Sequence, residues 1–172
     1  GLGGLYALLA TGIGAAVFVF AAGYLPWHLE HEGRPAREAH RFWPWMVLFM
    51  GAMVGLACAR DLVLLFVFFD LTAIASYFLI GFDRHRLDAR GAALMALLVT
   101  GVSAVLMLIG AVLLYAEYGT FSLPELFERA EGNTRTAAAA ALIAVAALAK
   151  SAQTPLHFWL PRAMAAPTPV SA

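Results

Sequence analysis

The sequence predicts an all-α integral membrane protein with about five transmembrane helices, the last of which is broken at Pro155. The composition supports this class, since 62% of the 172 residues are hydrophobic and only 13% are charged. The mean hydropathy is +0.80. Apolar runs of about 20 residues, the length that crosses a bilayer, recur along the chain. A soluble domain of this size could not hide five such runs from water.

The composition also excludes several function classes. The formal net charge is zero, so nothing indicates nucleic acid as a partner. The single cysteine, Cys58, excludes a disulfide or a Cys-ligated cluster within the chain. The chain begins with Gly1, and its first apolar run has neither a basic flank nor a cleavage site, so we expect no signal peptide. We expect a fragment of a larger membrane protein.

The five apolar segments lie at residues 2–24, 42–59, 62–82, 91–115 and 136–160. Only Arg60 and Asp61 separate the second segment from the third, which predicts a tight hairpin. Polar loops at 26–41 and 119–135 separate the first two and the last two segments. Within the latter, Ser122 begins a Ser-Leu-Pro-Glu pattern that predicts a short interfacial helix with a serine cap.

Small residues recur at four-residue spacing on two segments. They are Gly51, Gly55 and Ala59 on the second segment, and Ala96, Thr100 and Ala104 on the fourth. Small side chains let helix backbones approach closely, and in lipid, where the hydrophobic effect does not drive helices together, such close packing stabilises their association. The spacing therefore predicts a packed bundle and not a substrate site.

The arginines divide unequally between the two sides that these spans imply. One side carries Arg34, Arg37, Arg41, Arg84, Arg86, Arg90 and Arg162, and the other carries Arg60, Arg129 and Arg135. The positive-inside rule places the first set in the cytoplasm and the N-terminus outside. Three histidines, His28, His31 and His40, lie in the basic loop. A metal site there is possible, but their irregular spacing favours a solvated loop.

Two charged residues lie inside the predicted spans. Lys150, the only lysine, follows thirteen apolar residues, and Asp70 is the ninth residue of the third segment. An ammonium at membrane depth costs on the order of 3 kcal/mol by insertion scales, so it is rarely found there unless it has a functional role. The pair therefore predicts proton or ion handling. The alternative is an ion pair that only holds two helices in register, although buried pairs add little net stability.

The residues after Lys150 are unusually polar for a span, namely Ser151, Gln153, Thr154, Pro155 and His157. Pro155 lacks an amide hydrogen, so the helix is expected to kink or break there. Such breaks persist only where they are buried in protein or line a wet cavity. Gln153 and Thr154 are expected on the helix face of Lys150, beside a polar cavity. His157 is equally compatible with a proton relay and with an interfacial hydrogen bond.

Residues 149–172 resemble the broken-helix signature of antiporter-like membrane subunits, which occur in respiratory complex I, in Mrp-type cation/proton antiporters and in membrane-bound hydrogenases. Residues 66–81 resemble the acidic helix of the same family. Residues 49–53 and 118–122 are similar to it as well, so the resemblance covers nearly the whole chain. The His-Phe-Trp-Leu-Pro run at 157–161 and the Gly-Thr-Phe-Ser loop are most similar to the large A-type subunit of Mrp Na⁺/H⁺ antiporters.

The resemblance implies an antiporter-like inverted-repeat bundle, of which residues 1–172 form most of the first repeat. It also implies that Lys150 is the central-channel lysine and that Asp70 is its acidic partner, a position where the family usually has glutamate. The shorter aspartate places the carboxylate further from Lys150. The family's next helix, which carries a proton-passing histidine, and the second repeat lie outside this chain. An isolated 1–172 is therefore not expected to transport ions.

The expected function is that of a membrane subunit for proton translocation coupled to Na⁺/H⁺ antiport through a buried Asp70/Lys150 pair. One alternative is a proton-pumping membrane subunit of NADH:quinone oxidoreductase or of a membrane-bound hydrogenase, and another is a purely structural subunit. In each case the chain itself is a non-enzymatic subunit without catalytic residues, cofactor or metal. Its expected partners are the bilayer, other subunits, protons and Na⁺, and its expected location is the bacterial plasma membrane, crossed several times.

Overall fold

The computed structural model describes residues 1–164 and 166–171. Within these ranges the chain is helical, and its only β-type pairing is an isolated bridge between Asp61 and Ser122. The elements are α1 (Leu2–His31), the 3₁₀ helix η1 (Ala36–Arg41), α2 (Trp43–Cys58), α3 (Leu62–Ile80), α4 (Leu87–Tyr118), α5 (Leu123–Arg129), α6 (Thr134–Lys150), α7 (Trp159–Ala163) and α8 (Thr168–Ser171). The predicted all-α class is confirmed.

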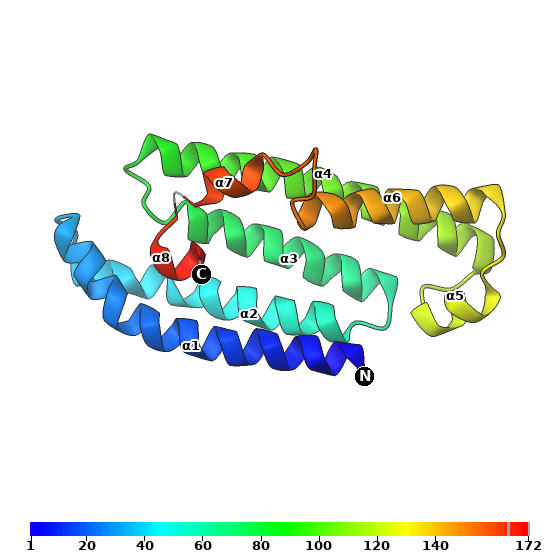
Figure 1. The fold of residues 1–172 in the computed structure, drawn as a ribbon, viewed down its shortest axis with the longest axis horizontal. Helices are drawn as coiled ribbons and strands as arrows, with labels where there is room; N and C mark the ends of the chain where they lie inside the picture. Colours follow the sequence, from blue (N-terminus) through cyan, green and yellow to red (C-terminus); the bar gives the residue numbers. More distant parts are fainter. Residues whose placement is uncertain (165, 172) are drawn as a thin grey trace.

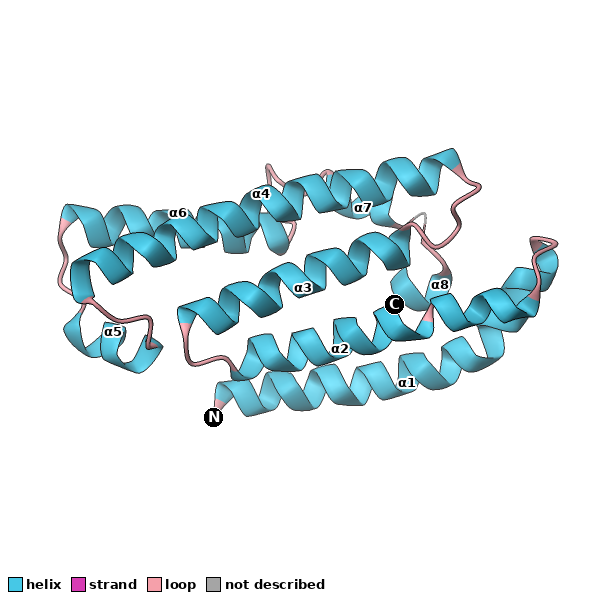
Figure 2. Cartoon of the chain, turned by 180° about the vertical axis from the view of Figure 1, so that it is seen from behind, coloured by secondary structure: helices cyan, strands magenta, loops and turns pink. Residues whose placement is uncertain are grey.

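The long helices pack side by side in chain order, each against the next, as α1, α2, α3, α4 and α6 (Figures 1 and 2). Successive helices run in opposite directions, so every second connection lies at the same end of the bundle. The short elements add contacts at the ends, where α5 packs on α4, α7 on α4, and α8 on α1. One end therefore collects the α1–α2 and α3–α4 connections together with α7 and α8.

Four helical segments of the described chain are long and apolar enough to cross a membrane: α1, η1 with α2, α3 and α4. The fifth predicted span, 136–160, is wrong in its bounds, because α6 has 17 residues and ends at Lys150. Large apolar side chains remain exposed on the bundle, as at Val19 and Val102. Exposed apolar side chains of this kind suit contact with lipid tails or neighbouring helices.

The first helix is longer than predicted. The sequence predicts a loop from Pro26, but α1 continues through this proline to His31. Leu25 and Leu29, on either side of Pro26, are fully buried in a core cluster that includes Phe42. Proline removes one backbone donor from a helix. Burial of the two leucines compensates for that loss, and a sequence pattern alone does not reveal such burial.

Side-chain caps define several helix ends. Asp61 Oδ1 accepts hydrogen bonds from the amides of Val63 at 2.8 Å and Leu64 at 3.3 Å, so it caps α3 and closes the predicted tight hairpin. Asn133 caps α6 in the same way. The predicted short helix is present as α5, but the Ser122 side chain makes no capping hydrogen bond there.

Small residues pack the helices closely, in part as predicted. Ala96, Thr100 and Ala104 are buried along α4. On α2, a Cβ added to Gly55 would collide with the Phe68 ring, whereas the space beside Gly51 is open. A close backbone approach at Gly110 of α4 was not part of the predicted pattern. A Cβ there would lie 2.7 Å from Ile143 Cγ1 and 2.9 Å from the carbonyl oxygen of Ala139 on α6.

Candidate ion-translocation site

Lys150 is the last residue of α6, and a reverse turn follows it directly. The amide of Gln153 donates to the carbonyl of Leu148 at 2.9 Å, and the amide of Ala152 donates to that of Ala149 at 3.2 Å. Ala152 has a positive φ of 51°. These two hydrogen bonds and the left-handed residue form a Schellman motif, which satisfies carbonyls that the end of a helix leaves free.

The helix break predicted at Pro155 therefore lies earlier, at Lys150. Because the helix has already ended, Gln153 and Thr154 do not follow Lys150 along one helix face as predicted, and both are exposed. The indole N–H of Trp159, at the start of α7, donates to the carbonyl of Ala149 at 3.0 Å. This bond ties the segment after the break back to the end of α6.

The Lys150 ammonium lies against the backbone and the ring of one residue on α3. Its Nζ donates to the carbonyl oxygen of Phe69 at 3.2 Å and lies 4.8 Å from the centre of the Phe69 ring. Thr72 Oγ1 donates to the same carbonyl at 2.7 Å. Phe69 is only 5% exposed. Phe69 was not predicted as a partner of Lys150, since a backbone acceptor leaves no signal in the side-chain pattern.

Asp70 follows Phe69 in the chain and is half-buried. Among the ion pairs of the described residues, none joins Asp70 to Lys150. The predicted Asp70/Lys150 pair is therefore not joined by a direct ion pair in this conformation. Successive helical residues point about 100° apart, and the ammonium is engaged at the position before Asp70. A functional coupling of the two charges stays a prediction.

The other residues predicted to support the site do not converge on Lys150. Those residues, all exposed, are Ser151, Gln153, Thr154, Pro155 and His157. The Ser151 hydroxyl donates to the carbonyl of Ala147 at 2.8 Å, so it is bonded to its own helix. The roles proposed for these five residues stay predictions. Ala165 and Ala172, which belong to the same motif, lie outside the described residues.

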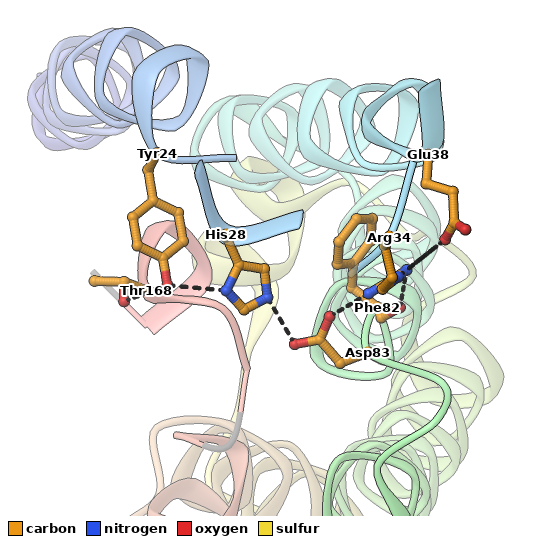
Figure 3. Close-up of polar contacts among 7 residues, drawn as sticks. All are labelled: Tyr24, His28, Arg34, Glu38, Phe82, Asp83 and Thr168. Carbon is orange, nitrogen blue, oxygen red and sulfur yellow. Dashed lines mark hydrogen bonds and ion pairs between the residues drawn. The ribbon is translucent and has the colours of Figure 1, made fainter. Parts of the chain in front are cut away.

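A second polar cluster, which the sequence did not predict, lies at the end of the bundle where α1 and α3 finish (Figure 3). Asp83, only 2% exposed, accepts from Arg34 Nη1 at 2.6 Å through Oδ1 and lies 3.1 Å from His28 Nε2 through Oδ2. Arg34 also donates to Glu38 Oε2, at 2.6 Å from Nη2 and 3.1 Å from Nε. The hydrogen bond from Arg34 lowers the pKa of Glu38 below its usual value, so this carboxyl is ionised at neutral pH.

His28 belongs to this cluster and not to a solvated loop, so that prediction is wrong for it. Its Nδ1 lies 3.4 Å from the Tyr24 hydroxyl, which in turn accepts from Thr168 Oγ1 of α8 at 3.1 Å (Figure 3). The described part of the chain contains no group of three or more His, Cys, Asp or Glu side chains that could hold a metal ion. Asp83 is far from its partners in sequence, so no spacing pattern could have identified the cluster.

The chain has clear relatives among known proteins. Residues 59–172 match the family model described as NADH:quinone oxidoreductase/Mrp antiporter, transmembrane. The chain is 39% identical to an Na⁺/H⁺ antiporter subunit of Alkalihalophilus pseudofirmus and 38% identical to a probable K⁺/H⁺ antiporter subunit of Rhizobium meliloti, in both cases over its whole length. It spans 21% and 17% of these relatives.

Two solved structures share the fold. The Mrp complex from Dietzia sp. superposes with a TM-score of 0.85 at 36% identity, over 99% of this chain and 18% of the matched one. An archaeal respiratory membrane complex, the membrane-bound sulfane sulfur reductase, gives a TM-score of 0.70 at 28% identity, over 74% of this chain and 26% of the matched one. In both cases the match covers only about a quarter of the other chain or less.

Proposed function

Since the chain belongs to the NADH:quinone oxidoreductase/Mrp antiporter transmembrane family, we propose that it is part of a membrane subunit that exchanges a monovalent cation for protons. The two curated relatives described above are named Na⁺/H⁺ and K⁺/H⁺ antiporter subunits, which supports the reaction class. The chain corresponds to about a fifth of their length, so the complete activity requires the remainder of the subunit. Its partners are the bilayer and the other subunits of a multisubunit complex.

The observation that carries this proposal is the position of the Lys150 ammonium. It lies at the end of a broken helix, on a carbonyl dipole and an aromatic ring, with no carboxylate of the described residues in contact. Moving a carboxylate from about 8 Å to about 4 Å from an ammonium changes their attraction by about 2 kcal/mol at an effective dielectric constant of 20. Movement of Asp70 over such a distance would change the ratio of protonated to deprotonated Lys150 by more than tenfold.

The proposed cycle uses these two charges in named roles. Lys150 takes up and releases a proton along a hydrated path at the centre of the bilayer, and Asp70 modulates its proton affinity. The segment after the break, with Ser151, Gln153 and Thr154, supplies polar groups for water, while Pro155 keeps the helix from re-forming. His157 passes protons toward the nearer membrane surface. In this proposal Na⁺ is the exchanged cation.

Transport by the full-length subunit in its complex tests the reaction class. The complex is reconstituted into proteoliposomes with an imposed pH gradient, and NaCl or KCl is added in the absence of NADH. Dissipation of the gradient by Na⁺ supports the proposal. Dissipation by K⁺ alone would still support cation/proton antiport, but it would identify K⁺ and not Na⁺ as the exchanged cation. Absence of a response to either cation would contradict antiport.

A respiratory proton pump is the second candidate, favoured by the 28% identity to the archaeal respiratory complex. Proton uptake in the same proteoliposomes that depends on an electron donor, and not on a cation gradient, would support it. A purely structural role requires an ion pair that holds α3 and α6 in register. The described residues show none between Asp70 and Lys150, so this role has little support.

A further inference from the structure

A large groove opens at the end of the bundle where α3 turns into α4. Its volume is about 1080 Å³. The first turn of α2 forms one wall, the last turn of α3 forms the floor, and the first two turns of α4 form the opposite wall. We call it the basic groove, because Arg34, Arg41, Arg84 and Arg90 line its outer part.

Three of these arginines have no acidic partner among the described residues. Arg34 is neutralised by Asp83 and Glu38, which hold its guanidinium in place. Arg41, Arg84 and Arg90 are exposed. None of the three appears in an ion pair with another described residue. None of these three guanidinium groups is therefore held by a carboxylate of the described residues in an ion pair, although the charge of Arg41 contributes to the lowered pKa of Glu38.

The opposite end of the bundle differs in this respect. Arg129 pairs with Glu125 at 3.6 Å, and Arg135 pairs with Glu117 at 3.3 Å. Two of the three arginines at that end therefore have their own carboxylates. Arginines without an ion pair among the described residues are therefore more frequent at the end that carries the basic groove.

The inner part of the basic groove is apolar and aromatic. Trp45 of α2 and Phe78 of α3 stack with ring centroids 3.8 Å apart and planes 11° from parallel. On the facing wall of α4, Leu94 is 51% exposed. These residues lie one to two helical turns inside the arginines, on helices long and apolar enough to span the membrane. The charged mouth of the groove thus lies directly next to an apolar surface.

We propose that the basic groove binds an anionic phospholipid. The phosphate lies between Arg41, Arg84 and Arg90, and an acyl chain runs along the wall formed by Trp45, Phe78 and Leu94. Basic pockets between transmembrane helices are suited to anionic headgroups, and guanidinium groups bind phosphate oxygens in bidentate fashion. A free phosphate ion would satisfy the arginines but would leave the apolar half of the groove without an occupant.

Lipid binding to the full-length protein in its complex tests this proposal. The detergent-purified complex is titrated with phosphatidylglycerol, and bound lipid is counted by native mass spectrometry. Phosphatidylcholine with the same acyl chains serves as the zwitterionic comparison. We expect tighter binding of phosphatidylglycerol. The triple change Arg41→Gln, Arg84→Gln, Arg90→Gln should weaken it roughly fivefold for each arginine, about a hundredfold in total.

The matched control is Arg60→Gln, Arg129→Gln, Arg135→Gln, which removes the same charge from the opposite end and should leave binding unchanged. A second variant, Leu94→Trp, keeps all three arginines and fills the apolar wall, so it should also weaken binding. Equal losses in the two triple variants would overturn the proposal. So would displacement of the lipid by millimolar inorganic phosphate, which would identify a free-anion site. The absence of a preference for phosphatidylglycerol would overturn it too, and would indicate that another segment or subunit fills the groove.

Discussion

At the scale of single residues, the two polar clusters differ in how their charges are compensated. Asp83 is fully enclosed and has a guanidinium and an imidazole within hydrogen-bonding distance. Lys150 has only a backbone carbonyl and a ring among the described residues. A nearby opposite charge favours the ionised form of a group, so a group without one changes its protonation more readily when a charge moves close to it. The first arrangement suits a structural clamp, and the second suits a group that changes its protonation.

Replacing Asp83 by alanine tests the clamp. Removal of one partner leaves Arg34 without its buried carboxylate, so we expect the free energy of unfolding to fall by about 3 kcal/mol. Glu38→Ala is the matched control on the same arginine. Because Glu38 is partly exposed, its loss should cost clearly less than the loss of Asp83. Denaturant unfolding of the full-length protein in detergent measures both, and equal losses would argue against a buried clamp.

At the scale of helices, the end of α6 and its contact with α4 position Lys150. The Schellman motif stops α6 at the lysine, and Trp159 holds the returning segment. Gly110 lets α4 approach the backbone of α6. Proline and polar residues allowed a break to be predicted in this region from the sequence. The position of the break could not be predicted, because an alanine in the sequence does not indicate the left-handed backbone conformation that Ala152 adopts.

Ala152→Gly tests the geometry of the break. A non-glycine residue in the left-handed region costs about 1–2 kcal/mol. Glycine removes this cost, but it loses more backbone entropy on folding, which offsets part of the stabilisation. We expect the variant to raise stability by up to about 1 kcal/mol in thermal unfolding and to retain transport. Ala147→Gly, inside α6, should instead cost about 1 kcal/mol. Destabilisation by Ala152→Gly to the same extent would show that Ala152 is not left-handed.

Gly110→Ala tests the contact between α4 and α6. The added methyl group would meet the carbonyl oxygen of Ala139, which cannot rotate away, so the helices must separate at a cost of about 1–3 kcal/mol. Gly101→Ala on the same helix has open space and should be neutral or slightly stabilising. Thermal unfolding of the two variants compares them directly. Equal stability would mean that α6 lies further from α4 than the Gly110 contact requires.

At the scale of the whole molecule, apolar length and the shared motifs predicted the helical class, the family and the order of the spans. The hairpin at Arg60 and Asp61 and the short helix α5 were also predicted, since both have local signals. The extension of α1 through Pro26 and the Asp83 cluster were not. Each depends on burial between segments far apart in sequence, as with Leu29 against Phe42 and Arg34 against Asp83.

The central claim is that Lys150 releases and regains a proton in each transport cycle, and Lys150→Arg tests it most directly. Arginine keeps the positive charge but stays protonated at accessible pH. The measurement is cation-driven proton movement in vesicles that contain the assembled full-length complex, with the amount of assembled complex as the control. The account predicts normal assembly and loss of proton-coupled transport. Antiport at the wild-type rate by Lys150→Arg would contradict it, because a permanent charge would then suffice.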